Sequence, residues 1–76
     1  MKQFIGSCVD NPFSSVEELS RIIDEAKEIT QTEFLEQCVI DEQVMPMMER
    51  YPSDFTYYKN GEVYFHTHSA IEYFYN

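Results

Sequence analysis

The dipeptide Asn60-Gly61 constrains the fold most, because it stands between two runs of aromatic residues, FTYYK and EVYFHTH. An Asn-Gly pair in this setting indicates a β-hairpin, since both residues tolerate the positive φ angles of a two-residue type I′ turn. The resulting pairs are Lys59 with Glu62, Tyr58 with Val63, Tyr57 with Tyr64, Thr56 with Phe65 and Phe55 with His66. The sequence therefore predicts an antiparallel hairpin in the last third of the chain.

Alternation along the hairpin gives its two faces different side chains. One face carries Thr56, Tyr58, Val63 and Phe65, and the other carries Phe55, Tyr57, Tyr64 and His66. If the first face packs on the core, the second is an exposed aromatic surface suited to partner binding, because Tyr is enriched at interface hot spots. The alternative is that an N-terminal strand or a final helix covers it. We define the second set as the aromatic surface.

Two helices are predicted ahead of the hairpin. Residues 14–29, SSVEELSRIIDEAKEI, begin with a capping box formed by Ser14 with Glu17 or by Ser15 with Glu18. The residues at helical spacing are Val16, Leu19, Ile22, Ile23, Ala26 and Ile29. Thr30 with Glu33 repeats the capping pattern, which predicts a second helix over residues 31–39.

Weaker patterns complete the predicted fold. Residues 1–9 suggest a short strand, and residues 41–51 suggest a helix that Pro46 shortens or kinks. Ser69, three residues before Glu72, suggests a short final helix. We therefore expect one α+β domain spanning residues 1–76, with two or three acidic amphipathic helices packed on a small antiparallel sheet.

Acidic residues dominate the surface chemistry, with a formal net charge of −9. Ten of the fourteen acids lie between Val16 and Glu49, where Arg21 and Lys27 are the only bases. A field of this sign repels nucleic acid and anionic membranes, so direct binding to either is not expected. A basic or nucleic-acid-binding protein surface is the expected partner.

The spacing of these acids suggests a specific surface. On the first predicted helix, Glu17, Asp24 and Glu28 lie opposite the apolar face, about 10 Å and 6 Å apart along the axis. Glu33 and Glu36 extend the set onto the second helix. We call these five residues the acidic surface. It is compatible with imitation of a row of DNA phosphates, and the alternative is that it is only the solvated face of two helices.

Metal and catalytic patterns are sparse. His66 and His68 share a strand face and could present two imidazoles to zinc, but further ligands would have to come from Cys8, Cys38 or a carboxylate. No glycine-rich phosphate loop or local nucleophile–base pair is present. We expect no metal, no cofactor and no enzymatic activity.

Compartment is indicated by the cysteines and by the hydropathy pattern. Cys8 and Cys38 form no CxxC or disulfide framework, so both are expected to be reduced thiols. Neither a signal-peptide pattern nor a stretch of membrane-spanning length is apparent. The sequence therefore predicts a cytoplasmic protein.

Two segments resemble parts of small uncharacterised bacteriophage proteins, which share an I-T-x-x-x-F start and an H-S-x-I-E-Y ending. The matching residues are Ile29, Thr30, Phe34, His68, Ser69, Ile71, Glu72 and Tyr73. The resemblance covers roughly the second half of the chain and implies a phage origin, hence the cytoplasm of a host cell. It marks no known activity.

These patterns favour a non-enzymatic binding protein. The expected function is that of a phage-encoded inhibitor or modulator of a host protein, such as a defence nuclease or transcription factor, through nucleic-acid mimicry. The alternative is a small homodimeric structural or regulatory module.

Overall fold

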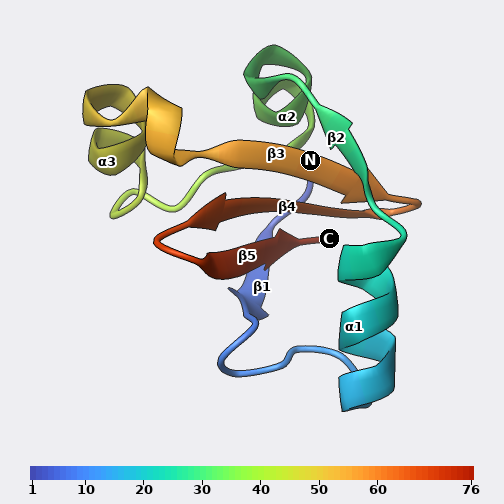
Figure 1. Ribbon diagram of the computed structural model, residues 1–76. Helices are drawn as coiled ribbons and strands as arrows, with labels where there is room; N and C mark the ends of the chain where they lie inside the picture. Colours follow the sequence, from blue (N-terminus) through green and yellow to red (C-terminus); the bar gives the residue numbers. More distant parts are fainter.

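A five-stranded antiparallel sheet forms the centre of the protein in the computed structural model, which describes residues 1–76 (Figure 1). Its strands are β1 (Phe4–Ser7), β2 (Lys27–Ile29), β3 (Thr56–Asn60), β4 (Val63–His68) and β5 (Ile71–Tyr75), in the order β1-β5-β4-β3-β2. The helices are α1 (Val16–Asp24), α2 (Gln31–Gln37), α3 (Met45–Arg50) and the 3₁₀ helix η1 (Pro52–Asp54). The predicted α+β class is confirmed.

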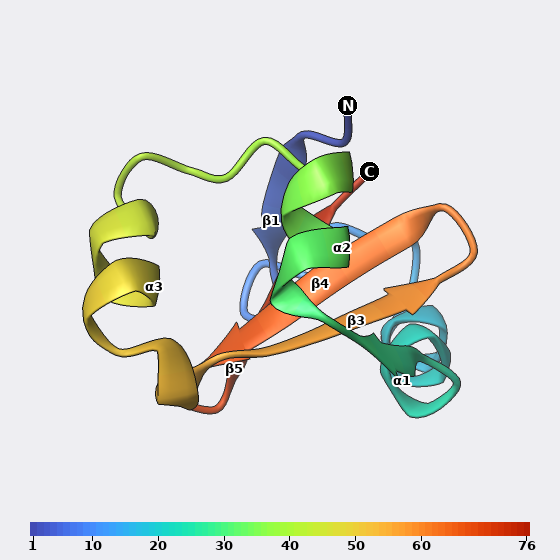
Figure 2. The same ribbon diagram turned by 90° about the horizontal axis from the view of Figure 1, so that it is seen from above.

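The helices do not gather on one face of the sheet. α2 lies over one face, α1 lies on the opposite side, and α3 lies beyond the open end of the β3–β4 hairpin, away from its turn (Figures 1 and 2). The Asn60 side-chain amide ties α1 to its face by donating to the Ile22 carbonyl at 3.2 Å. Both faces of the sheet are therefore covered, at least in part.

Helix α1 begins as predicted and ends early. Ser15 is the N-cap, since its hydroxyl oxygen accepts from the Glu18 N–H at 3.1 Å and the Glu18 carboxylate accepts from Ser14 in return. The predicted extension to Ile29 is wrong, because β2 occupies residues 27–29 and pairs with β3. Strand pairing outweighs helical periodicity there, and it places Ile29 against the core.

Helices α2 and α3 are both present but shorter than predicted, and α3 begins at Met45 rather than at residue 41. Thr30 caps α2 by accepting from the Glu33 N–H at 3.1 Å. The helix stops at Gln37 rather than residue 39, because Cys38 turns extended and bridges Lys2. Pro46 lies in the first turn of α3, where a missing N–H costs no hydrogen bond, so it shortens the helix without kinking it.

The hairpin is present, but its register differs from the prediction by two residues. Tyr57 pairs with His66 and Asn60 with Val63, so the loop is Gly61-Glu62. Gly61 has φ +59° and Glu62 has no positive φ, which fits a type II′ rather than a type I′ turn. The bond from Asn60 to α1 favours keeping this residue in the strand. A two-residue shift preserves the predicted faces, because side chains alternate with a period of two.

The predicted final helix is wrong, since residues 71–75 form β5. Ser69 and Ala70 have φ angles of +52° and +63°, as a two-residue type I′ turn requires. β5 then pairs with β4 on one side and with β1 on the other. The alternation of Ile71, Tyr73 and Tyr75 suits a strand that contributes to the core, and this outweighs the Ser69–Glu72 capping pattern.

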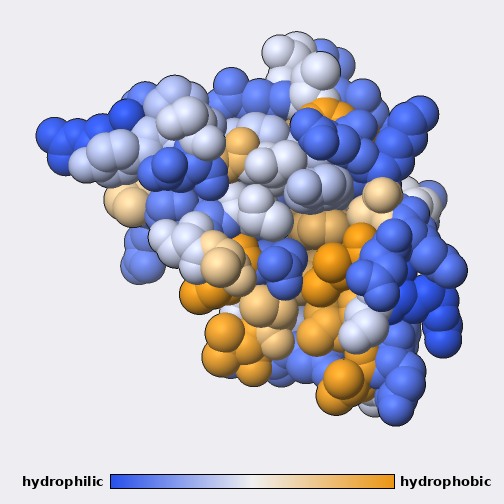
Figure 3. Space-filling view, viewed as in Figure 1, coloured by the Kyte–Doolittle hydropathy of each residue, from blue (hydrophilic) through white to orange (hydrophobic).

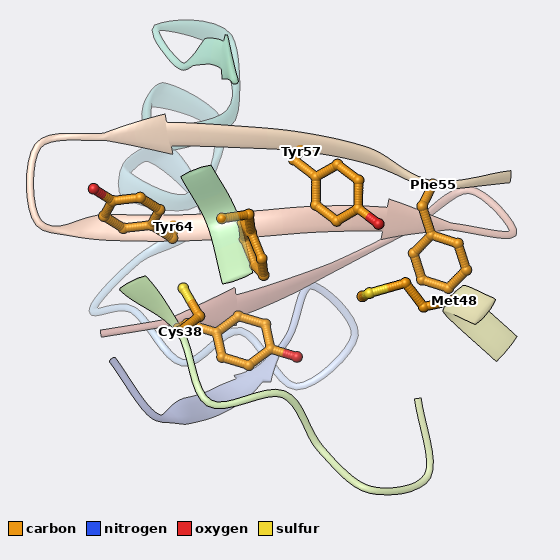
Figure 4. Packing of buried hydrophobic residues seen from close by; sticks show 7 residues of the cluster. Cys38, Met48, Phe55, Tyr57 and Tyr64 are labelled. Carbon is orange, nitrogen blue, oxygen red and sulfur yellow. The ribbon is translucent and has the colours of Figure 1, made fainter. Parts of the chain in front are cut away.

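The main core lies between the sheet and α2. Phe34 is fully buried at its centre, with the Tyr57, Tyr64 and Tyr75 rings at centroid distances of 5.1, 6.2 and 5.4 Å. Figure 4 shows Phe55, Tyr57 and Tyr64 projecting from the hairpin toward the same layer, with Met48 at its α3 end. On the opposite face, Phe74 packs against Phe13 at 4.9 Å.

Both cysteines are free thiols, as expected. Cys38 is buried at the end of α2, and burial raises the pKa of its thiol to about 11, opposed weakly by Lys2. The buried thiol is therefore protonated and unreactive at neutral pH.

Candidate functional site

The aromatic surface is not exposed. Phe55, Tyr57, Tyr64 and His66 are 7%, 6%, 9% and 0% exposed, so the prediction that they form an accessible docking surface is wrong. The alternative, that another element covers this face, is correct, but the covering element is α2, which inserts Phe34 among the four side chains, rather than an N-terminal strand or a final helix. The four residues belong to the core.

His66 is the one polar side chain at the centre of this core. Five rings surround it at centroid distances between 5.1 and 6.3 Å: Phe34, Phe55, Tyr57, Tyr73 and Tyr75. Its Nε2 shares a hydrogen bond of 3.0 Å with the Tyr75 hydroxyl, and its buried Nδ1 has no partner. Burial and, to a lesser extent, the neighbouring His68 lower the pKa of His66 to about 4, so the ring is neutral at pH 7.

The acidic surface is split between the two sides of the sheet. Glu17 and Asp24 are exposed on α1, about 10 Å apart along the helix axis, as predicted. Glu28 lies on β2 rather than on this helix, so its predicted place in a helical row is wrong. It pairs across from Tyr58, on the α1 side of the sheet, and remains exposed. These three residues form the α1-side acidic surface.

The other two predicted acids lie on α2, across the sheet from α1. Glu36 is exposed, whereas Glu33 forms an ion pair with Lys59 at 2.9 Å. The hydrogen bond and charge of Glu33 raise the pKa of Lys59. Glu33 therefore stabilises the contact between α2 and β3, and the five acids do not form one continuous surface.

Most of the negative charge has no ionic partner. The protein has two ion pairs, one between Glu33 and Lys59 and one between Glu62 and Lys2, the latter at 2.7 Å. Twelve of the fourteen acidic residues are therefore in no ion pair. Asp24 and Glu25 stand at the C-terminal end of α1, where the partial negative charge of the helix disfavours acids by about 0.3–1 kcal/mol each. Stability of the fold alone does not account for these two positions.

A groove that the sequence did not indicate lies beside β1. It has a volume of about 440 Å³ and is bounded by β1, the chain after it, the segment between α2 and α3, and the turn end of the β4–β5 pair. Its apolar lining residues are Phe4, Val44, Met47 and Tyr73, and Asp10, Asp41 and His68 are among the polar ones. These residues are far apart in the sequence and belong to no shared motif, so only the fold brings them together.

Apolar surface also remains on the α1 side of the sheet. Val9 and Val16 are 75% and 67% exposed, and Ile5 is 38% exposed. Figure 3 shows hydrophobic surface below the sheet, beside the hydrophilic outer side of α1. α1 itself buries no residue completely, so its cover of this face is thin.

The remaining chemistry is limited to these surfaces. No three His, Cys, Asp or Glu side chains lie close enough together to bind a metal ion. His66 and His68 share a face, but His66 bonds Tyr75 and the His68 ring stacks on Phe55 at 4.6 Å. None of the helices is long and apolar enough to cross a membrane.

Comparisons with known proteins identify no relative. No protein-family model matches the chain, and neither a curated protein nor a solved structure is significantly similar to it.

Proposed function

We propose that this chain is a non-enzymatic binding protein whose α1-side acidic surface, formed by Glu17, Asp24 and Glu28, binds a basic protein surface. The observation that carries the proposal is the unpaired acid at the unfavourable end of α1, where Asp24 is exposed and Glu25 follows it. Charge that only kept the protein soluble would serve equally well elsewhere. A partner with a nucleic-acid-binding surface would complement it, because that surface already binds rows of negative charge.

The resemblance to phage proteins extends this proposal to a biological role. A phage-encoded protein of this kind would inhibit or modulate a host protein by occupying its nucleic-acid groove. A defence nuclease or a transcription factor has such a groove. The site of action would be the host cytoplasm.

Charge reversal tests the proposal directly. The protein is used as bait in bacterial lysate, and bound proteins are identified by mass spectrometry. We expect a nucleic-acid-binding protein that is released by salt and displaced by added double-stranded DNA. The Glu17→Lys, Asp24→Lys, Glu28→Lys triple variant should lose it, since all three side chains are exposed and replacing them leaves the core intact.

A matched variant separates position from total charge. Glu42→Lys, Glu49→Lys and Asp54→Lys change the net charge by the same amount at exposed positions around α3, away from α1. This variant should retain the partner. Capture that resists salt and DNA, or that both triple variants lose equally, would contradict recognition by the α1-side acidic surface.

A homodimer is the second candidate, favoured by exposed Val9 and Val16 on the α1 side. Sedimentation equilibrium at increasing salt tests it, because screening of the −9 charge should promote association of two like-charged copies. A monomer at all salt concentrations would exclude this candidate.

A further inference from the structure

We propose that the groove beside β1 binds an arginine side chain from an extended segment of a partner protein. This site is distinct from the α1-side acidic surface, since α3 and α1 lie at opposite ends of the molecule (Figure 1). The groove, at about 440 Å³, is within the size range of small-ligand sites and has ample room for one side chain.

The walls of the groove suit an apolar stem. Phe4 from β1 and Met47 from α3 are 41% and 39% exposed, although both side chains are large and apolar. Tyr73 adds a second ring, with its centroid 6.5 Å from that of Phe4. Arginine and lysine both bury alkyl stems against such walls, and a guanidinium group also stacks on aromatic faces.

The charge of the groove selects a cation. Asp10 and Asp41 both line it, and no Lys or Arg does. Neither carboxylate is in an ion pair, because the two ion pairs of the protein are Lys2 with Glu62 and Lys59 with Glu33. Asp41 is also fixed in position, because its Oδ1 accepts from the Gln43 N–H at 2.9 Å. An incoming guanidinium would therefore meet a carboxylate that is already oriented.

Arginine fits this combination better than lysine. A guanidinium offers five N–H donors in a planar arrangement that can reach two carboxylates, and it is more weakly hydrated than an ammonium group. An apolar groove with acids at its margin favours a cation that loses its water easily. The flanking partner backbone would lie outside the groove, along the exposed side of β1.

The edge of β1 limits how the partner binds. Lys2 already exchanges backbone hydrogen bonds with Gln37 and Val39, and the Ser7 carbonyl accepts from Asp10 and Asn11. An irregularity between Phe4 and Gly6 interrupts the strand as well. A long added strand therefore has few free groups to pair with, so recognition depends on the side chain in the groove.

Titration with short peptides tests the proposal. The probe is the capped tripeptide N-acetyl-Gly-Arg-Gly-amide, followed by amide shifts in two-dimensional NMR spectra of the whole chain. The matched probe replaces arginine with citrulline, which keeps the shape and removes the charge. We expect saturable shifts around Ser7, Val44 and Tyr73, and binding of the citrulline peptide weaker by at least about fivefold. A lysine peptide should fall between the two.

Variants locate the binding. Asp10→Asn with Asp41→Asn should weaken binding of the arginine peptide by at least about fivefold, and the side-chain amide oxygen introduced by Asp41→Asn can still accept from the Gln43 N–H. The matched variant, Glu17→Gln with Asp24→Asn, removes two charges from α1 and should leave this binding unchanged. Met47→Lys, at an exposed position on the groove margin, should abolish binding of the arginine peptide. This second variant keeps the test valid if the aspartate variant does not fold.

Three results would overturn the proposal. They are equal binding of the citrulline peptide, unchanged binding by both groove variants, and shifts that centre on α1. Because the α1 variant is measured in the same experiment, failure of the groove is distinguishable from failure of the α1-side acidic surface.

Discussion

His66 shows how a single side chain couples this small core to pH. The imidazole is fully buried among five aromatic rings, and its hydrogen bond to Tyr75 does not compensate for burial of a charge. Burial also raises the pKa of Tyr75, whose hydroxyl shares the hydrogen bond with His66. His66 therefore stabilises the core only while its imidazole is neutral.

Stability should fall in mild acid because of His66. Its pKa is about 4 in the folded protein and about 6.5 in the unfolded chain, so the unfolded chain binds the proton first as pH decreases. The contribution is complete above pH 6.5 and is lost as pH falls from about 6.5 to about 4. Urea unfolding should show a loss of about 1.4 kcal/mol between about pH 7.5 and pH 5.5. His66→Phe should remove most of this loss, and a pH dependence that persists in that variant would assign it to other groups.

At the scale of elements, local signals were predictable and pairing was not. The caps at Ser15 and Thr30 follow from side-chain chemistry within one turn, and both are present. Residues 27–29 and 71–75 are strands because of their neighbours in the sheet, which no local pattern specifies. The groove was missed for the same reason, since its walls come from separate elements. The sheet separates the acids of α1 from those of α2, and Glu28 lies on β2 rather than on the predicted helix.

The β4–β5 turn is the element where a single substitution should most readily increase the stability of the fold. Ala70 has φ +63°, a conformation that costs a residue with a Cβ about 1 kcal/mol, and it is exposed. Ala70→Gly should therefore raise the free energy of unfolding by about 0.5–1 kcal/mol. Gly61→Ala is the converse control, because Gly61 has φ +59° and open space around it. It should lower stability by about 1 kcal/mol, and a loss of stability in both variants would refute the argument.

For the molecule as a whole, net charge is the dominant electrostatic property. The chain of 76 residues has a formal net charge of −9 and only two ion pairs. Its unpaired negative charges repel one another within the folded protein. Repulsion of this kind is stronger in the folded state, where the charges are closer together than in the unfolded chain. A partner that supplied positive charge would relieve it.

Salt should consequently stabilise the free protein. Raising NaCl from about 0.05 M to about 0.5 M should increase the free energy of unfolding by about 1 kcal/mol, because screening reduces the repulsion. The Glu17→Lys, Asp24→Lys, Glu28→Lys variant carries −3, since each substitution adds two charges to −9, and it should gain less. Chemical unfolding with urea, which is uncharged, measures both. An equal gain in the two proteins would point to a general salt effect.

The pairing of β1 with β5 joins the first strand of the chain to the last (Figure 1). Gln3 and Asn76 exchange backbone hydrogen bonds of 3.2 and 2.9 Å, so this contact spans almost the whole sequence. Closing so long a loop is slow, which places the joining of β1 late in folding. During synthesis, residues 3–7 must remain without their β5 partner until residues 71–76 have left the ribosome. Until then the Phe4–Ile5 segment is exposed to chaperones and to other nascent chains.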